Sequence, residues 1–175
     1  DLKYAGAHTR LVIGSGNHFR EFVTIHRGTE GGGGVTSIGD GNWFLGYVHI
    51  AHDCVVGNRT TFSNNSQLAG HVVVDDWVVL GGFAGVHQFC RLGEHSMAAA
   101  GSIVLQDIPP FVTAAGYPAK AAGTNNEGLR RRGFTPEQIL AVRRAYKVLY
   151  RGGHSLDDAK LRLAEMAREE PVLAS

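Results

Sequence analysis

The sequence carries little net charge, which limits the kinds of partner that it could bind. Its 17 lysines and arginines nearly balance 16 aspartates and glutamates, and the formal net charge is +1. This balance predicts no general attraction to nucleic acid, which is bound mainly through clustered basic side chains. No stretch approaches the roughly 20 apolar residues of a membrane-spanning helix, and no signal peptide is visible. We therefore expect a soluble cytoplasmic protein with no nucleic-acid partner and no membrane span.

The glycine-rich segment 30–34 also lacks features that a phosphate-binding loop requires. It has no Lys-Ser/Thr ending, and no helical pattern follows it. We expect a flexible loop there instead of a phosphate site.

What the chain does have is an apolar residue at every sixth position over a long stretch. The pattern holds without a miss at Ile38, Phe44, Ile50, Val56, Phe62, Leu68, Val74, Leu80, Val86, Leu92, Ala98 and Val104. A period of six fits neither the 3.6-residue turn of a helix nor the alternation of an ordinary strand. A fixed period of this kind indicates a solenoid.

The columns beside the apolar one favour a tight corner after each short strand, because the residues there are mostly small or β-branched. The pattern resembles the hexapeptide repeat of left-handed parallel β-helices, in which three hexads form one triangular coil. We predict a mainly β protein with such a β-helix over residues 1–110, in which residues 38–109 supply four coils. An earlier trio, Ile13, Phe19 and Ile25, supplies about one more, and we expect that further N-terminal coils are missing.

The repeat places the two cysteines, Cys54 and Cys90, in one column and two coils apart. Stacked strands lie about 4.8 Å apart, so the two residues would be roughly 10 Å apart. A disulfide needs Cα atoms within about 7 Å. The sequence therefore predicts two buried free thiols.

The hexad pattern stops after Pro109-Pro110, and residues 111–134 are predicted to be an irregular connector. A helical extension over residues 135–175 should follow. Thr135, Pro136 and Gln138 form a helix start with a capping box, and Gly152-Gly153 ends this helix. A second helix should open at Ser155 and run to about Glu169. Because two short helices form no core alone, we expect them to pack beside the prism or on a neighbouring subunit.

Stacking in steps of three hexads gathers polar side chains on one edge of the prism. His52 should lie above Gly70, and Asp53 above His71, with His49 nearby. A neutral histidine beside a carboxylate can act as a general base, and a glycine can offer its N–H to a developing oxyanion. Two alternatives remain open, namely a solvated polar face and a zinc site held by imidazoles.

Eight short motifs carry a family resemblance. They are Asp1-Leu-Lys-Tyr-Ala-Gly6, Thr24-Ile-His-Arg-Gly-Thr29, His49-Ile-Ala-His-Asp-Cys54, Gly57-Asn-Arg59, Leu68-Ala-Gly-His71, Val86-His-Gln-Phe-Cys90, Gln106-Asp107…Pro109-Pro110 and Glu127-Gly-Leu…Arg131-Arg-Gly-Phe134. In this order they resemble the bacterial acyl-ACP:UDP-N-acetylglucosamine O-acyltransferases, which perform the first step of lipid A biosynthesis.

The resemblance implies a homotrimer with active sites between subunits and with no cofactor or metal ion. It implies transfer of an (R)-3-hydroxyacyl group from acyl carrier protein to the 3-hydroxyl of UDP-N-acetylglucosamine. His52 matches the general base, Asp53 its orienting partner and Gly70 the oxyanion donor. Positions that match the substrate-binding residues are Asp1, Lys3, His49, His71, His87, Gln88, Asn125, Glu127, Arg131 and Arg132. His26 also matches a family position, without an assigned step.

Two departures from the family pattern concern the acyl chain. Pro118 stands where long-chain members tend to have histidine, and Ala100 stands at the level that sets acyl length, where long-chain members can carry glycine. We expect the extra methyl group to shorten the acyl groove. The alternative functions are another hexapeptide acyltransferase (N-acyl or CoA-dependent), a trimeric zinc hydratase, and a purely structural or surface-binding β-helix.

Overall fold

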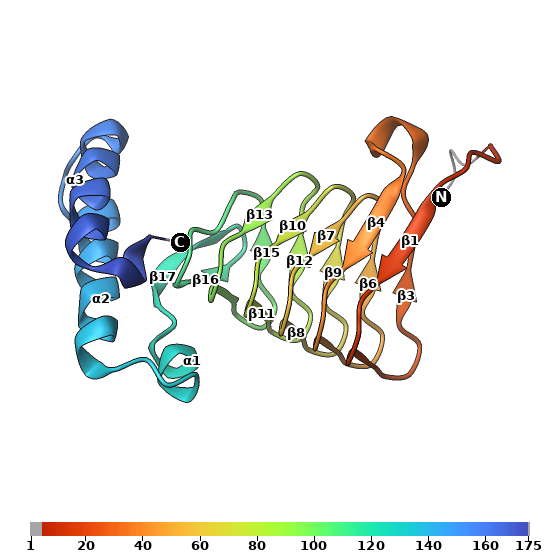
Figure 1. Ribbon diagram of the computed structural model, residues 1–175, viewed down its shortest axis with the longest axis horizontal. Helices are drawn as coiled ribbons and strands as arrows, with labels where there is room; N and C mark the ends of the chain where they lie inside the picture. The colour runs from red at the N-terminus through yellow and green to blue at the C-terminus, as the bar shows by residue number, and fades with distance from the viewer. Residues whose placement is uncertain (1–4, 175) are drawn as a thin grey trace.

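The six-residue repeat folds into short strands that wind into a parallel β-solenoid with three sheets (Figure 1). The computed structural model describes residues 5–174. The first sheet contains β1 (Arg10–Ile13), β4 (Val35–Ile38), β7 (Val55–Val56), β10 (Val73–Val74) and β13 (Arg91–Leu92). The second contains β2 (His18–Phe19), β5 (Trp43–Phe44), β8 (Thr61–Phe62), β11 (Val79–Leu80), β14 (Met97–Ala98), β16 (Val112–Gly116) and β17 (Ala119–Thr124). The third contains β3 (Thr24–Ile25), β6 (His49–Ile50), β9 (Gln67–Leu68), β12 (Gly85–Val86) and β15 (Ile103–Val104).

The core of the prism is the predicted apolar column. All twelve residues from Ile38 to Val104 at hexad spacing are 4% exposed or less. Residues one coil apart stack as parallel partners, as Phe44 does on Phe62 and Ile50 does on Leu68. The predicted coil length and β-helix core are therefore confirmed.

Corners of the coils are built from residues in the left-handed backbone region. Asp53, His71 and Phe89 have φ values of 59°, 62° and 66° in one corner column. Residues other than glycine seldom adopt this backbone conformation, because their Cβ atom crowds the backbone. Here the corner is held by hydrogen bonds between coils, such as His71 N–H to the His52 carbonyl at 3.0 Å. Corner side chains consequently project from the prism in regular files.

An insertion interrupts the regular coil spacing between β3 and β4. Ile13 pairs with Ile38, which is 25 positions later instead of 18, so the extra residues leave the prism as a loop beside β4 (Figure 1). We expected a flexible loop. The loop contains a 3₁₀ turn over Glu30–Gly32, in which the amides of Gly32 and Gly34 donate to the Thr29 carbonyl at 3.1 and 2.8 Å.

Both cysteines are buried and free, as predicted. The Cys54 thiol donates to the Ala69 carbonyl at 3.2 Å. Burial raises the pKa of Cys54 to about 11 and also raises the pKa of Cys90. Neither thiol is therefore ionised near neutral pH, and both side chains pack in the apolar core.

The prediction of an irregular connector over residues 111–134 is wrong. The segment contains a hairpin of β16 and β17, in which β16 also pairs in parallel with β14, and a short helix, α1 (Asn126–Arg131). The strands are rich in alanine and lack most of the β-branched residues that mark strands in a sequence. Pairing with β14 on the preceding coil, 16 positions earlier in the sequence, determines the conformation of β16.

The hexad pattern also continues where it was predicted to stop, but in a shifted frame. Ile108 pairs with Leu92 and Ala114 pairs with Ala98, in each case 16 positions apart instead of 18. Both residues are 4% exposed and extend the core. The last coil is therefore shorter, which moves the core position from 110 to 108.

The two C-terminal helices form as predicted. They are α2 (Pro136–Arg151) and α3 (Leu156–Glu169), followed by a 3₁₀ turn over Pro171–Leu173. The Thr135 capping box is present, and the Ser155 side chain caps α3.

Helices α2 and α3 lie at the C-terminal end of the prism (Figure 1). Val142 packs with Phe111 and Leu129, and the Tyr146 hydroxyl donates to the Ala121 carbonyl at 3.3 Å. Among the described residues, no helix is long and apolar enough to cross a membrane.

Candidate active site

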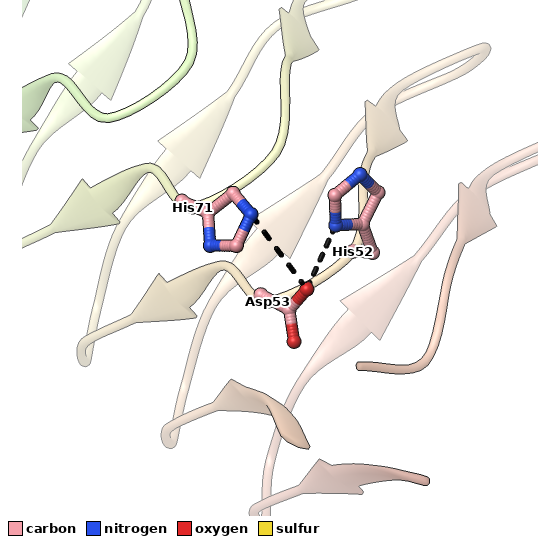
Figure 2. Close-up of side chains that lie close together, drawn as sticks. All are labelled: His52, Asp53 and His71. Atoms are coloured by element: carbon pink, nitrogen blue, oxygen red, sulfur yellow. Dashed lines mark hydrogen bonds and ion pairs between the residues drawn. The ribbon is translucent and has the colours of Figure 1, made fainter. Parts of the chain in front are cut away.

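One corner of the prism brings together an imidazole, a carboxylate and a second imidazole (Figure 2). His52 and Asp53 follow β6, and His71 follows β9 on the next coil. His52 Nδ1 lies 2.8 Å from Asp53 Oδ2, and His71 Nε2 lies 3.9 Å from the same oxygen. The His52 side chain is 29% exposed, whereas that of Asp53 is 1% exposed. A solvent-accessible imidazole is thus backed by a buried carboxylate. The stacking of coils predicted the proximity of His52, Asp53 and His71, but not the burial of Asp53.

Asp53 is held by more partners than the sequence suggested. The Thr29 N–H donates to Oδ1 at 2.8 Å and the Thr29 hydroxyl donates to Oδ2 at 2.5 Å. The Asp53 N–H donates to the Thr36 hydroxyl at 2.8 Å. Burial alone would raise the pKa of Asp53, but the hydrogen bonds from Thr29 and His52 and the proximity of His71 outweigh it and lower that pKa. Asp53 is therefore an anion at neutral pH.

Gly70 lies directly against the His52 ring. A Cβ atom added at Gly70 would come within 2.7 Å of His52 Cε1 and 2.9 Å of Nε2. Gly70 is itself buried, and no hydrogen bond from its N–H is found within residues 5–174. The stacking of His52 on Gly70 confirms the predicted file, and it leaves a backbone donor beside the imidazole.

Further histidines extend along the same face of the solenoid. His49 Nδ1 is 2.8 Å from the Thr24 hydroxyl, and the rings of His26 and His49 meet edge to face at 4.8 Å. Burial lowers the pKa of both His26 and His49, so both favour the neutral form. On the other side, His71 stacks on Phe89 with ring centroids 4.6 Å apart.

His87 and Gln88 are exposed on the coil after His71, and His87 Nδ1 lies 3.2 Å from the Gln88 carbonyl. Ala100 is exposed at another corner, in the file with Gly82, whose carbonyl accepts from the residue after Ala100 at 2.8 Å. Asp1 and Lys3 lie outside the described residues.

A second group of predicted binding residues lies on a different corner column. There the His95 ring stacks between Trp77 and Phe111, with centroids 5.9 and 5.7 Å away. The Arg132 guanidinium lies 5.4 Å from the centre of the Trp77 ring, and its Nη1 is 3.3 Å from His95 Nδ1. Burial first and then Arg132 lower the pKa of His95 to about 4. Neutral His95 can therefore accept a hydrogen bond from Arg132.

The short helix α1 supplies the other members of this group. Asn125 is buried, donates to the His95 carbonyl at 2.9 Å and accepts from the Gly128 N–H at 3.2 Å. Glu127 forms ion pairs with Arg130 and Arg131. Within one chain, the structure does not bring these residues to His52. Asn125 in particular has a structural use as the cap of α1.

The ligand atoms of His52, Asp53 and His71 lie within 4.8 Å of one another, a spacing that could accommodate a metal ion. Asp53, however, already accepts two hydrogen bonds from Thr29 and one from His52. A metal ion would have to displace these bonds. The arrangement therefore suits proton transfer better than metal binding.

Several residues that shape these sites were missed by reasoning from the sequence. Thr29 lies in the insertion, out of step with the hexads, and its contact with Asp53 is invisible to a rule based on coil stacking. Trp77 and His95 are 18 positions, or one coil, apart in sequence, so the repeat could have predicted that their rings stack. Their contact with Arg132 depends on how α1 folds back.

Comparisons with known proteins bear on the whole described fold. An acyl-acyl-carrier-protein–UDP-N-acetylglucosamine O-acyltransferase of Thiobacillus denitrificans is 58% identical over 167 residues, which cover 95% of this chain and 65% of that protein. The structure of UDP-N-acetylglucosamine acyltransferase from Bacteroides fragilis is 35% identical with a TM-score of 0.90, over 99% of this chain and 68% of that one. The chain belongs to the UDP-N-acetylglucosamine O-acyltransferase family.

Other matches agree with this family. The Francisella novicida UDP-N-acetylglucosamine acyltransferase structure has a TM-score of 0.95 at 44% identity, over 99% of this chain and 64% of that one. The model for domain 2 of UDP-N-acetylglucosamine O-acyltransferases matches residues 107–175, and that for bacterial transferase hexapeptides (six repeats) matches residues 35–70. The chain spans about 65% of the length of the curated relatives that it matches. The family resemblance seen in the sequence is confirmed.

Proposed function

We propose that the protein transfers an (R)-3-hydroxyacyl group from acyl carrier protein to the 3-hydroxyl of UDP-N-acetylglucosamine, the first step of lipid A biosynthesis. The observation that carries this proposal is the accessible His52, paired with buried Asp53 and stacked on Gly70. The names of the relatives supply the substrate class. Such a reaction would take place in the cytoplasm.

In the proposed mechanism, His52 acts as the general base. Its Nδ1–H is held by Asp53, so Nε2 is the nitrogen that accepts the proton of the sugar hydroxyl. The hydroxyl oxygen attacks the thioester carbonyl, and the Gly70 N–H stabilises the resulting oxyanion. The C–S bond then breaks, and His52 returns the proton to the departing carrier thiolate. The acyl group ends as an ester on the sugar, with no cofactor or metal ion.

The remaining residues would bind the two substrates. Guanidinium groups bind phosphate through paired hydrogen bonds, which suits Arg131 and Arg132 to the phosphates of the nucleotide or the carrier. Because these arginines lie at the end of α1, and Arg132 contacts a different corner column from that of His52, we propose a homotrimer in which facing protomers complete each site. The other proposed binding residues are Asp1, Lys3, His49, His71, His87, Gln88, Ala100, Asn125 and Glu127.

The test is to incubate the purified protein with UDP-N-acetylglucosamine and a mixed acyl-ACP pool and to weigh the product. An alkali-labile ester on the sugar supports the proposal. An amide product, or transfer from acetyl-CoA alone, would favour another hexapeptide acyltransferase. Hydratase activity that disappears after chelation would favour the zinc alternative, and either of these outcomes would overturn the proposal.

Ala100→Gly is expected to shift the preferred donor towards a longer acyl chain. Ala100 is exposed in a corner file, and removal of its methyl group would leave more space for an acyl chain at that corner. Each methylene newly accommodated contributes about 0.8 kcal/mol of apolar burial, or roughly fourfold in kcat/KM. The measurement is kcat/KM for acyl-ACPs of increasing length. An unchanged order of preference would count against a role for Ala100 in acyl-chain selection.

A further inference from the structure

The glycine-rich insertion 28–34 has no place in the mechanism above, although it contacts the catalytic corner. We propose that two residues of this loop serve the catalytic corner: Gly32 covers the Asp53 carboxylate, and Thr29 is a positioning residue that acts on His52 through that carboxylate. The inference rests on the proposed role of His52 as the base.

Thr29 donates hydrogen bonds to both oxygens of the Asp53 carboxylate. Its N–H donates to Oδ1 at 2.8 Å and its hydroxyl donates to Oδ2 at 2.5 Å. His52 Nδ1 approaches the same Oδ2 at 2.8 Å. Three donors in these directions fix the rotation of the carboxyl group. The imidazole that Asp53 holds is thereby fixed as well, with its other nitrogen directed away from the carboxylate.

Gly32 closes the loop over the carboxylate. A Cβ atom added at Gly32 would overlap the carboxyl group of Asp53. The tight fit explains why the Asp53 side chain is only 1% exposed although its backbone stands at a corner with a φ of 59°. The loop therefore needs glycine at position 32, whereas an added Cβ at Gly31 would meet nothing within 4 Å.

A loop that buries the Asp53 carboxylate must also supply hydrogen-bond donors to keep that carboxylate ionised. A buried carboxylate tends to become protonated, and a protonated Asp53 would no longer stabilise a positive imidazolium. Hydrogen bonds from Thr29 offset the effect of burial and help to keep the pKa of Asp53 low. Within residues 5–174, the other titratable groups that interact with the pair are His71, 3.9 Å from Asp53, His26, which interacts with His52, and Cys54, whose pKa Asp53 helps to raise. The charged residue of the loop itself is Glu30, and Arg27 immediately precedes the loop.

Thr29→Val tests the positioning role, because it removes the hydroxyl donor and keeps the N–H. We expect kcat to fall about tenfold with little change in KM, as for loss of one hydrogen bond to a charged group. The pKa of Asp53 should rise, so its charge is lost earlier as the pH falls. With one donor fewer on its carboxylate, the His52–Asp53 pair should take up a proton at higher pH, and the acid limb of the pH–rate profile should move to higher pH with it. Thr29→Ser, which restores the donor, should recover most of the rate.

Gly32→Ala and Gly31→Ala form a matched pair within the same turn. Gly32→Ala should displace the loop from Asp53 and reproduce the effect of Thr29→Val on kcat and on the acid limb. Gly31→Ala should leave both unchanged. Equal effects of the two substitutions would contradict a specific contact between Gly32 and Asp53.

Direct titration of the Asp53 carboxyl carbon by ¹³C NMR separates this inference from the proposed function. If the wild-type protein transfers no acyl group, the proposed function fails, yet the titration still reports whether Thr29 stabilises the Asp53 anion. If wild-type transfer is normal and Thr29→Val lowers kcat equally at every pH without moving the Asp53 titration, the positioning role is overturned. A shift in both measurements supports it.

Discussion

His52→Ala is expected to reduce kcat for acyl transfer by about 10²–10⁴-fold, the range that general-base catalysis supplies. The substitution removes the one imidazole within residues 5–174 that is both bonded to Asp53 at 2.8 Å and stacked on Gly70. Binding of UDP-N-acetylglucosamine should change much less, because the loss is in proton transfer. The measurement is single-turnover transfer with saturating acyl-ACP, beside calorimetric binding of the nucleotide sugar.

The matched control for this substitution is His154→Ala. His154 is exposed after α2 and has no part in the proposed site. It should leave transfer, oligomeric state and melting temperature unchanged, and His52→Ala should leave the last two unchanged. Near-wild-type turnover of a folded His52→Ala protein would falsify the general-base role.

Gly70→Ala is the second substitution with a large expected effect. Its new methyl group would come within 2.7 Å of the His52 ring, which must then move away from the position above the amide. Loss of one oxyanion donor costs about 10²–10³ in kcat in other enzymes, and displacement of the base adds to this loss. The measurement is kcat for the best acyl donor, compared with the wild-type protein.

Gly123→Ala serves as the control for an added methyl group, since a Cβ there would meet nothing within 4 Å. It should retain wild-type kcat. If Gly70→Ala also retains wild-type kcat while its fold is intact, then neither the Gly70 amide nor the close approach of His52 matters to the reaction. The oxyanion assignment would have to be abandoned.

The interior of the solenoid was the most predictable part of the molecule. Each coil buries one apolar residue per side at a constant interval, so Phe62 and Leu80 could be assigned to the core from spacing alone. The helix at Pro136 was equally predictable, because its capping box involves residues that are close together in sequence. In both cases the signal is periodic or local.

The end of the prism was harder to predict for a physical reason. Ile108 and Ala114 keep the hexad interval, but a shortened coil shifts their frame. Counting every sixth residue in the original frame therefore suggests that the repeat has stopped, although it continues two positions earlier. The hairpin that follows contains alanines with weak strand preference, and its pairing with β14 comes from contact between coils.

The candidate site divides in the same way. His52 and Gly70 are separated by one coil length, so the period alone predicts that they meet. Thr29 is 24 residues from Asp53, because the insertion breaks the repeat between them. Arg132 reaches Trp77 only after α1 has folded against the corner. Contacts made by an insertion, or by a helix that folds back onto the prism, cannot be predicted from the period of the sequence.

The amino-acid sequence by itself was enough to establish the solenoid, its apolar interior, the terminal helices and the meeting of His52 with Asp53 and Gly70. Apart from the helices, whose capping signals are local, these features follow from one coil length repeated along the chain. Three-dimensional folding determined how deeply Asp53 is buried, which donors hold it, and on which corner Arg132 lies. Those outcomes depend on segments that leave the repeat, whose positions are set by packing against coils distant in sequence.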